Sequence, residues 1–494
     1  MPHVLAVDQG TSSSRAIVFD PAGAVIAAAQ RPLGQSFPAN GLVEQDPEDI
    51  WRTTLDAVRQ ALSAAAAAGV ETVDIAAMGI ANQRETTVLW DAETGIPVHP
   101  AIVWQDRRTA EHCAAMRKDG VEDSIRDITG LLIDPYFSST KLAWLLDRPD
   151  IRRKAEAGRL RFGTVDSFLI WRLTNGRKHC TDATNASRTQ LYDIARHAWS
   201  DTLLNYFGIP GAVLPEVKDS VDDFGVADPA HFGSAIPICG VAGDQQAALV
   251  GHGCLEPGMT KSTYGTGCFL MTNTGDDRIA SKARLLTTVA YRIGGKTAFA
   301  LEGSIFSAGT AIKWLRDRLG LIGTAAESEV LARRVDGETR DVYVVPGFTG
   351  LGAPHWRPDA RGLITGLTLD DGRDEIVAAT LKSVGFQTAD LIHAIKTDGV
   401  AASALRIDGG MVANDWLCQF LADVTGLPIE RPEVTETTAY GAARLGALGA
   451  GLIGDLAEAS AARPPEARFV PKASSAQREK WLVGWRRAVR RALA

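Results

Sequence analysis

The sequence has little cysteine and no closely spaced cysteine pair. Its 494 residues include six cysteines, and no two of them form a C-x-x-C motif. This spacing argues against a disulfide-rich secreted scaffold and against a structural zinc site. We therefore interpret the cysteines as scattered small apolar residues of a protein from a reducing compartment.

Long apolar runs and an excess of basic charge are also missing. No stretch reaches the roughly 20 apolar residues that a membrane span requires, and the N-terminus, with a charge at Asp8, lacks the apolar core of a signal peptide. We therefore expect a cytoplasmic protein without a membrane span. Lysine and arginine total 52 against 59 aspartates and glutamates, a net charge of −7, which argues against a dedicated nucleic-acid binder.

Signatures of several common enzyme classes are absent as well. There is no G-x-G-x-x-G after the first apolar run, no H-E-x-x-H and no G-x-S-x-G. Residues 253–258 have the glycine spacing of a P-loop, but Met259 occupies the position of its lysine. Without that lysine the segment cannot hold the β- and γ-phosphates of a nucleotide in the P-loop manner.

What is present is a regular alternation of short apolar runs, turns and amphipathic stretches. Runs at 4–7, 16–19 and 25–29 predict a strand meander, and Asp46-Pro47-Glu48 predicts a helix start. A second set of strands is expected at 260–264, 269–272, 285–291, 296–301 and 405–407. Helices are expected at 305–319 and 375–396. We therefore expect a mixed α/β protein with two domains, residues 1–250 and 251–494.

The C-terminal segment 478–491 is basic and has Trp481, Trp485 and Val489 on one helical face. We interpret it as a terminal helix docked on the protein with a solvated basic side. A helix lying on a membrane surface is the alternative.

Two loops carry residues suited to binding phosphate, and a third would suit the close approach of a nucleotide base or ribose. The segment Asp8-Gln9-Gly10-Thr11-Ser12-Ser13-Ser14-Arg15 offers hydroxyls, backbone N–H groups and a guanidinium, and Asp8 could hold Mg²⁺ through water. A second glycine-rich hairpin surrounds Thr266, and Gly409-Gly410 precedes a helix. Taken alone, each of these segments could equally be an ordinary polar turn.

Asp244 follows the apolar run 236–241 and opens an alanine-rich stretch. A carboxylate at a strand-to-helix junction faces the functional edge of an α/β sheet. It is therefore either a general base or a helix N-cap.

Together these motifs resemble the FGGY carbohydrate kinase family, and in particular its glycerol-phosphorylating members. The resemblance runs from about Val4 to the C-terminal helix with its landmarks in family order. The segments that carry it are 8–15, 82–87, 104–105, 134–141, 184–189, 242–247, 264–269 and 408–414. It implies two actin-like, ribonuclease-H-like domains with an ATP-binding cleft between them. It also implies transfer of the γ-phosphoryl group of ATP to glycerol with Mg²⁺.

The resemblance assigns a role to individual residues. Asp244 matches the catalytic base, and with Asp8 it is expected to serve the metal. The positions that match glycerol-binding residues are Arg84, Glu85, Trp104, Tyr136, Asp244, Gln245 and Phe269. The positions that match nucleotide contacts are Thr11, Ser12, Ser13, Arg15, Thr266, Gly309, Lys313, Gly410 and Asn414; Lys313 stands where the best-known members have glutamine.

Regulation and assembly are also suggested by the resemblance. The loop 229–234 lacks the Gly-Gly-Lys-Gly-Gly-Thr-Arg segment linked to inhibition by fructose-1,6-bisphosphate. It resembles the loop that some members present to the histidine phosphocarrier protein, with His231 as the phosphorylated residue; the alternative is an ordinary surface histidine. A homo-oligomer is expected by analogy. Two rival functions are another FGGY kinase acting on a pentulose, gluconate or erythritol, and an actin-like ATP-binding assembly protein.

Overall fold

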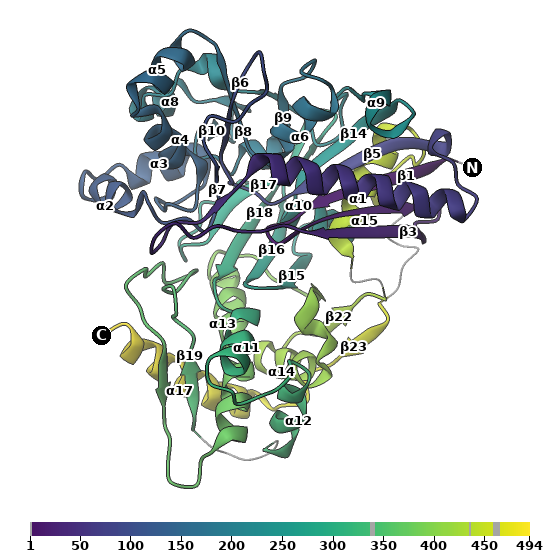
Figure 1. Cartoon of the computed structure of the whole chain (residues 1–494). Helices are drawn as coiled ribbons and strands as arrows, with labels where there is room; N and C mark the ends of the chain where they lie inside the picture. The colour runs from purple at the N-terminus through teal and green to yellow at the C-terminus, as the bar shows by residue number, and fades with distance from the viewer. Residues whose placement is uncertain (1, 336–340, 434–435, 458–464) are drawn as a thin grey trace.

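The computed structural model describes residues 2–335, 341–433, 436–457 and 465–494. Two lobes are visible in Figure 1, and each is built around one large β-sheet. The N-terminal half of the chain forms the upper lobe, and most of the C-terminal half forms the lower one. The prediction of a two-domain α/β protein is therefore confirmed, while the boundary at residues 250/251 stays a prediction.

The first sheet has the strand order β13-β14-β5-β1-β2-β3. The meander β1 to β3 is antiparallel, whereas β5 and β14 run parallel to β1. Its strands are β1 (His3–Gln9), β2 (Ser13–Phe19), β3 (Val25–Pro32), β5 (Ile75–Asn82), β13 (Val226–Ala227) and β14 (Ile236–Gly243). Gln9, Asn82 and Gly243 pair across the parallel strands, so the loops after them leave the sheet at one edge.

The second sheet repeats this arrangement and adds one strand, β17, at an edge. Its order is β17-β18-β16-β15-β21-β22-β23, again with an antiparallel meander followed by parallel strands. The strands are β15 (Thr260–Tyr264), β16 (Cys268–Gly275), β17 (Leu286–Ile293), β18 (Lys296–Ile305), β21 (Leu405–Asp408), β22 (Ile429–Arg431) and β23 (Ala467–Phe469). Because Thr263 pairs with Asp408, the loops after β15 and β21 also share an edge.

Helix α1 (Pro47–Ala67) covers one face of the first sheet, against β2 and β3. Asp46 caps it by accepting from the Glu48 amide, as the sequence predicts. The other helices of this lobe are α2 (Ala110–Lys118), α3 (Glu122–Thr129), α4 (Ser138–Leu146), α5 (Pro149–Glu156), α6 (Val165–Leu173), α7 (Ala183–Ala186), α8 (Asp201–Phe207), α9 (Pro229–Phe232) and α10 (Asp244–Gly251), with 3-10 turns at Thr72–Asp74 and Gly211–Val213. Short strand pairs are β4 (Glu44–Gln45) with β7 (Ala101–Ile102), β6 (Val88–Asp91) with β8 (Leu160–Gly163), β9 (Cys180–Asp182) with β12 (Glu216–Lys218), and β10 (Tyr192–Asp193) with β11 (Ala198–Trp199).

The lower lobe contains α11 (Gly309–Asp317), α12 (Glu327–Arg334), α13 (Arg373–Thr397), η3 (Gly410–Ala413), α14 (Asp415–Thr425) and α17 (Ser475–Ala492), with the strand pair β19 (Tyr343–Val345) and β20 (Leu363–Thr365). Helix α17 is docked on the protein. The buried Trp485 ring stacks on Phe386, and its Nε1 donates to Asp390 at 2.6 Å. Docking rather than membrane contact is therefore the arrangement of this basic helix.

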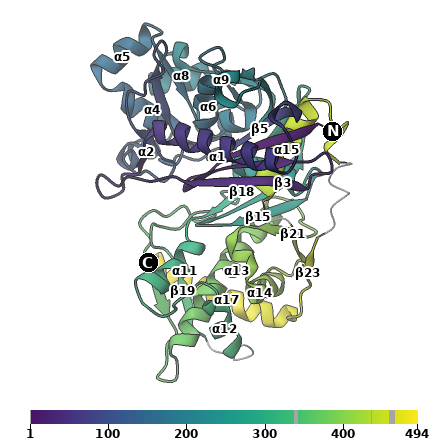
Figure 2. The same cartoon turned by 45° about the vertical axis from the view of Figure 1, so that its right-hand side comes forward.

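Helix α15 (Thr437–Gly449) follows the second sheet in sequence but packs on the first, against β1, β5, β14 and α10. Figure 2 shows it in yellow beside the purple strands of the upper lobe. The approach is so close that a Cβ at Gly79 would clash with the Ala442 carbonyl oxygen, and one at Gly441 with that of Ala247. Glycine at these positions allows the backbone of α15 to contact the sheet at Gly79 and helix α10 at Ala247 directly.

One local prediction was wrong, and one of two alternatives is excluded. The helix expected from residue 305 begins at Gly309, because β18 continues to Ile305 in register with β16. Asp244 is not an N-cap: Gly243 holds that position and Asp244 is the first helical residue of α10.

Candidate active site

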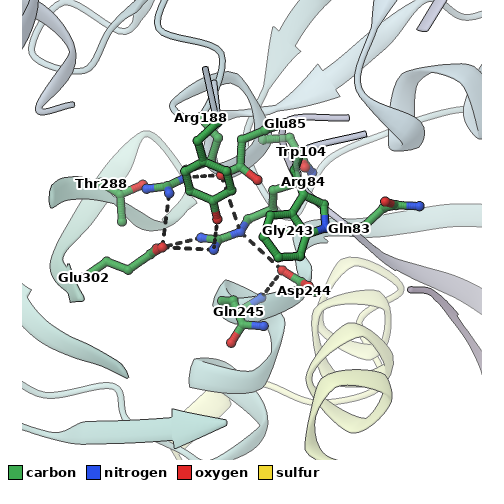
Figure 3. Close-up of polar contacts among 12 residues, drawn as sticks. Gln83, Arg84, Glu85, Trp104, Arg188, Gly243, Asp244, Gln245, Thr288 and Glu302 are labelled. Carbon is green, nitrogen blue, oxygen red and sulfur yellow. Dashed lines mark hydrogen bonds and ion pairs between the residues drawn. The ribbon is translucent and has the colours of Figure 1, made fainter. Parts of the chain in front are cut away.

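The residues predicted to bind the acceptor come together at the edge where the parallel strands of the first sheet end. Arg84 and Glu85 follow β5, and Asp244 follows β14 directly. Tyr136 precedes α4, while Phe269 lies on β16 of the second sheet. The site is therefore built from both lobes, as Figure 3 shows around Arg84.

Arg84 is the centre of this cluster, and its side chain is 2% exposed. Its Nη1 and Nη2 donate to the Glu302 carboxylate at 2.6 and 3.0 Å, and its Nε lies 3.2 Å from Asp244 Oδ1. Tyr136 Oη is 3.4 Å from Nη2. The guanidinium is therefore held in one orientation between carboxylates of the two lobes.

Asp244 is partly exposed toward the site. Burial raises the pKa of its carboxyl, while Arg84 and the Lys261 ammonium oppose that rise. Asp244 Oδ1 also accepts from the backbone N–H of Gln245 at 2.7 Å. The result is an oriented carboxylate of increased basicity, which suits acceptance of a proton from a hydroxyl group.

Glu85 is held in an unusual backbone conformation, with φ +59°. Its carbonyl oxygen accepts from Ser138 Oγ at 3.0 Å and from Lys141 Nζ at 3.3 Å. Lys141 also donates to the Tyr136 carbonyl at 2.7 Å. One buried lysine thus fixes the backbone of two predicted acceptor-binding residues.

Aromatic rings form a wall beside these polar groups. The Trp104 ring makes edge contacts with Tyr136 and Phe269, with centroid distances of 5.6 and 5.9 Å. Trp104 Nε1 donates to Thr11 Oγ1 at 2.9 Å. The predicted acceptor wall and the first phosphate hairpin are therefore in direct contact.

The first hairpin, residues 10–12, is closed by a hydrogen bond that the Gly10 backbone N–H donates to the Ser13 carbonyl at 2.9 Å. Ser12 is exposed. Arg15 forms an ion pair with Glu436, just before α15. Burial, together with the Asp244 and Asp408 carboxylates and against the opposing effect of Arg15, raises the pKa of Asp8 to about 6. Three carboxylates therefore face one region between the lobes.

The predicted nucleotide contacts of the second lobe line one cavity of about 360 Å³. Gly309, Lys313, Gly410 and Asn414 all lie on its wall, together with Tyr264 and Met411. The exposed turn at Thr266 docks on the start of α11, where Gly309 donates to the Gly265 carbonyl at 3.0 Å. A neighbouring cavity of about 480 Å³ is lined by Arg15, Gly410 and Arg431, so it opens between the two lobes.

The sequence matches both domains of one family along most of its length. Residues 3–251 match the N-terminal domain of the FGGY family of carbohydrate kinases, and residues 260–450 match the C-terminal domain. The chain belongs to the FGGY family of carbohydrate kinases. The resemblance identified from the motifs is therefore confirmed.

Several relatives within the FGGY family are similar over their full length. The glycerol kinase of Rhodospirillum centenum is 57% identical over 491 residues, covering 99% of this chain and 98% of that protein. Glycerol kinase 1 of Pseudomonas aeruginosa is 55% identical over 490 residues, with 99% and 98% covered. The crystal structure of Plasmodium falciparum glycerol kinase with ADP has a TM-score of 0.91 and 34% identity, covering 100% of this chain and 99% of that one.

The fold is shared more widely among FGGY kinases. A xylulose kinase structure from Lactobacillus acidophilus has a TM-score of 0.88 at 20% identity, covering 100% of this chain and 98% of that one. At this identity the similarity shows the fold alone.

Four polar residues of the site were not predicted from the sequence. Arg188 and Glu302 pair with Arg84 and Glu85, Lys261 contacts Gln245, and Lys141 holds two backbone carbonyls. A signal was available for Glu302, the single charge within the otherwise uncharged run 297–305. A charge buried in a strand needs a partner, which makes such a residue a candidate for a site.

His231 lies on α9, in contact with α1 and α6 rather than with the cluster around Arg84. Its Nε2 lies 3.2 Å from the Arg172 carbonyl, and its ring meets the edge of Trp51. Burial lowers its pKa.

Within the described ranges, no helix is long and apolar enough to cross a membrane.

Proposed function

We propose that this chain transfers the γ-phosphoryl group of ATP to a terminal hydroxyl of glycerol, giving sn-glycerol 3-phosphate and ADP in glycerol uptake and catabolism. The observation that carries the proposal is the convergence of Arg84, Glu85, Tyr136 and Asp244 beside the aromatic wall. The names of the relatives, at 54–57% identity over nearly the whole chain, support the same acceptor.

Glycerol is a small triol, and its recognition needs several donors and acceptors at fixed positions. Arg84 and the side-chain NH₂ group of Gln245 supply donors, while the Glu85 and Asp244 carboxylates supply acceptors. The Trp104 and Phe269 rings would contact the carbon backbone of glycerol. A site whose polar groups are all paired by the substrate discriminates against analogues that lack a hydroxyl.

Asp244 is the proposed general base. Its carboxylate accepts the proton of the attacking hydroxyl as the oxygen bonds to the γ-phosphorus and ADP leaves. Arg84, 3.2 Å away, keeps the carboxylate oriented. Phosphoryl transfer depends mainly on positioning and charge stabilisation, which a fixed cluster of this kind provides.

The nucleotide is proposed to occupy the 360 Å³ cavity with its phosphates toward the two hairpins. Thr11, Ser12, Ser13, Arg15 and Thr266 would contact the phosphates, while Gly309, Lys313, Gly410 and Asn414 would contact the rest of the nucleotide. ADP in the Plasmodium falciparum structure supports this class of ligand.

Mg²⁺ fits the carboxylates at the same place. In the described part of the chain no group of three or more His, Cys, Asp or Glu side chains could hold a metal alone, and Mg²⁺ typically uses one or two carboxylates with substrate phosphates. Asp8 and Asp244 are the proposed ligands, because a cation would stabilise the charged form of Asp8, which burial and the neighbouring carboxylates disfavour. When bound, the ion neutralises phosphate charge.

The test is ADP release with Mg-ATP against glycerol, dihydroxyacetone, erythritol, D-xylulose and D-gluconate. Glycerol is expected to give the highest kcat/KM. A preference for a sugar would replace the proposal with another FGGY kinase activity. ATP binding without turnover, together with nucleotide-dependent sedimentation, would favour an actin-like assembly protein.

Three further proposals concern setting, assembly and regulation; the first rests on the sequence composition and the other two on the resemblance. The chain works in the cytoplasm, it forms a homo-oligomeric dimer or tetramer, and the histidine phosphocarrier protein phosphorylates His231. Light scattering on purified protein measures the oligomeric state, and a mass equal to one chain would contradict the second proposal.

A further inference from the structure

Four buried side chains form a ring of alternating charge in the acceptor site. Glu302 Oε1 accepts from Arg188 Nη2 at 3.1 Å, and Arg188 Nε donates to Glu85 Oε1 at 2.7 Å. Arg84 closes the ring, with its bidentate contact to Glu302 and its Nε 3.9 Å from Glu85 Oε1. Each of the four is at most 2% exposed.

The ring joins the two lobes, as the dashed lines in Figure 3 show. Glu302 lies on β18 of the second sheet, opposite Met271 of β16. Arg84, Glu85 and Arg188 all come from the first lobe. The single carboxylate from the second lobe therefore balances the guanidinium groups of two residues from the first.

We propose that Glu302 is a positioning residue for acceptor binding, which holds Arg84 in the orientation that glycerol needs and acts together with Arg188. Glu302 does not have to touch the substrate for this role. The inference rests on the proposed function of the site.

The physical argument concerns the two edges of the Arg84 guanidinium. Glu302 occupies the Nη1–Nη2 edge, which leaves Nε as the atom facing Asp244. Without a carboxylate at 302, Arg84 would turn this edge toward Asp244, because a bidentate pair is stronger than a single contact. The site would then lose an oriented donor for glycerol, and both oxygens of Asp244 would be occupied.

Burial makes the carboxylate hard to replace. Despite the burial, which by itself raises the pKa of Glu302, Arg188 and Arg84 lower it to about 2. Glutamine has the same shape but no charge. Its NH₂ group would face a guanidinium, which has no acceptor atom for a hydrogen bond. Glu302→Gln therefore preserves the side-chain shape, removes the ion pairs and places one donor group against another.

The experiment compares steady-state kinetics of the full-length wild type, Glu302→Gln and Glu302→Asp, varying glycerol and ATP separately. Glu302→Gln is expected to raise the glycerol KM by about tenfold or more, since breaking a buried charge pair is costly. The ATP KM is expected to stay within about twofold. Glu302→Asp, which keeps the charge on a shorter side chain, is expected to fall between wild type and Glu302→Gln.

A second ion pair between the lobes provides the matched control. Arg292 Nε on β17 lies 3.0 Å from Asp219 Oδ1, and neither residue belongs to the acceptor cluster. Asp219→Asn removes a charge from this partly exposed inter-lobe pair, away from the acceptor cluster. Its glycerol KM is expected to match that of the wild type.

An unchanged glycerol KM in folded Glu302→Gln would overturn the inference. Equal increases in the glycerol KM and the ATP KM would also overturn it, because they would indicate a general structural role. If Glu302→Gln does not fold, Arg188→Lys tests the same ring and is expected to raise the glycerol KM selectively. Failure of the proposed function is distinct, because the wild type itself would then prefer another acceptor, on which the same variants are measured.

Discussion

Lys261 Nζ lies 2.5 Å from the side-chain oxygen of Gln245. The two residues come from different lobes, since Lys261 is on β15 of the second sheet and Gln245 is in the first turn of α10, which follows the first sheet. Because the ammonium only donates, it fixes the amide with its oxygen toward Lys261 and its NH₂ group directed elsewhere. A predicted glycerol-binding side chain is thereby made a donor.

Substitution of Lys261 tests this orientation. Lys261→Met keeps most of the apolar stem, frees the Gln245 amide and removes a positive charge that faces Asp244. We expect the glycerol KM to rise and kcat to fall by about tenfold or more, the loss of one charged hydrogen bond in a buried site. The exposed Lys296 on β18 gives the control Lys296→Met, whose kinetics should equal those of the wild type.

Asp244→Asn removes the proposed base and keeps its shape. We expect kcat to fall by about 10²- to 10⁴-fold, the usual contribution of a general base, while glycerol still binds in a calorimetric titration. Asp201, the first residue of α8, supplies the matched variant Asp201→Asn, with an expected kcat equal to that of the wild type. A nearly normal kcat in Asp244→Asn would remove Asp244 from the proton transfer.

Gly410 offers a clean test of the nucleotide cavity, because no atom lies within 4 Å of a Cβ added there. Gly410→Leu therefore adds a side chain on the wall of the cavity, and its Cβ meets no protein atom. The ATP KM is expected to rise by tenfold or more, with glycerol binding and Tm nearly unchanged. Gly211 is equally open but belongs to the first lobe, so Gly211→Leu should leave both constants unaltered.

Lys141 predicts a pH dependence of stability. Burial lowers its pKa from 10.5 to about 7, so above pH 7 the folded protein has released a proton that the unfolded chain keeps. Unfolding then takes up a proton, and the free energy of unfolding rises with pH by about 1.4 kcal/mol per unit.

Denaturant unfolding of wild type and Lys141→Met between pH 6 and 9 isolates this contribution. The difference between the two proteins should be flat below pH 7 and should grow in favour of the wild type above it. A difference that stays constant over the whole range would show that Lys141 remains charged in the folded state.

Phosphorylation of His231 stays a prediction. The contact of Nε2 with the Arg172 carbonyl indicates that this nitrogen carries the ring proton and donates it. Incubation with the histidine phosphocarrier and its phosphoryl donor should add the mass of one phosphoryl group to the wild type and none to His231→Gln. No mass gain in the wild type would end the proposal.

Local sequence patterns predicted part of the frame of the site. The apolar run before Asp244 indicated that this residue lies at the functional edge of an α/β sheet, whereas the role of Arg84 came from the family resemblance. The pairing of Arg84 with Glu302 is different, because the two residues are 218 positions apart. Which strand of the second sheet faces Arg84 depends on how the lobes meet, and no local periodicity encodes that. The helix start at 309 was missed for a related reason: residues 302–305 suit a strand or a helix, and pairing with β16 decides between them.

The packing of α15 on the first sheet has a consequence for synthesis of the chain. A ribosome releases the strands of the first sheet early, but residues 437–449, which cover one of its faces, are made near the end. Apolar surface on β1, β5 and β14 thus waits for nearly two hundred further residues after β14 has emerged. Nascent chains halted before residue 437 should therefore bind chaperones and be cut by proteases within the first lobe, whereas chains that extend beyond residue 449 should resist.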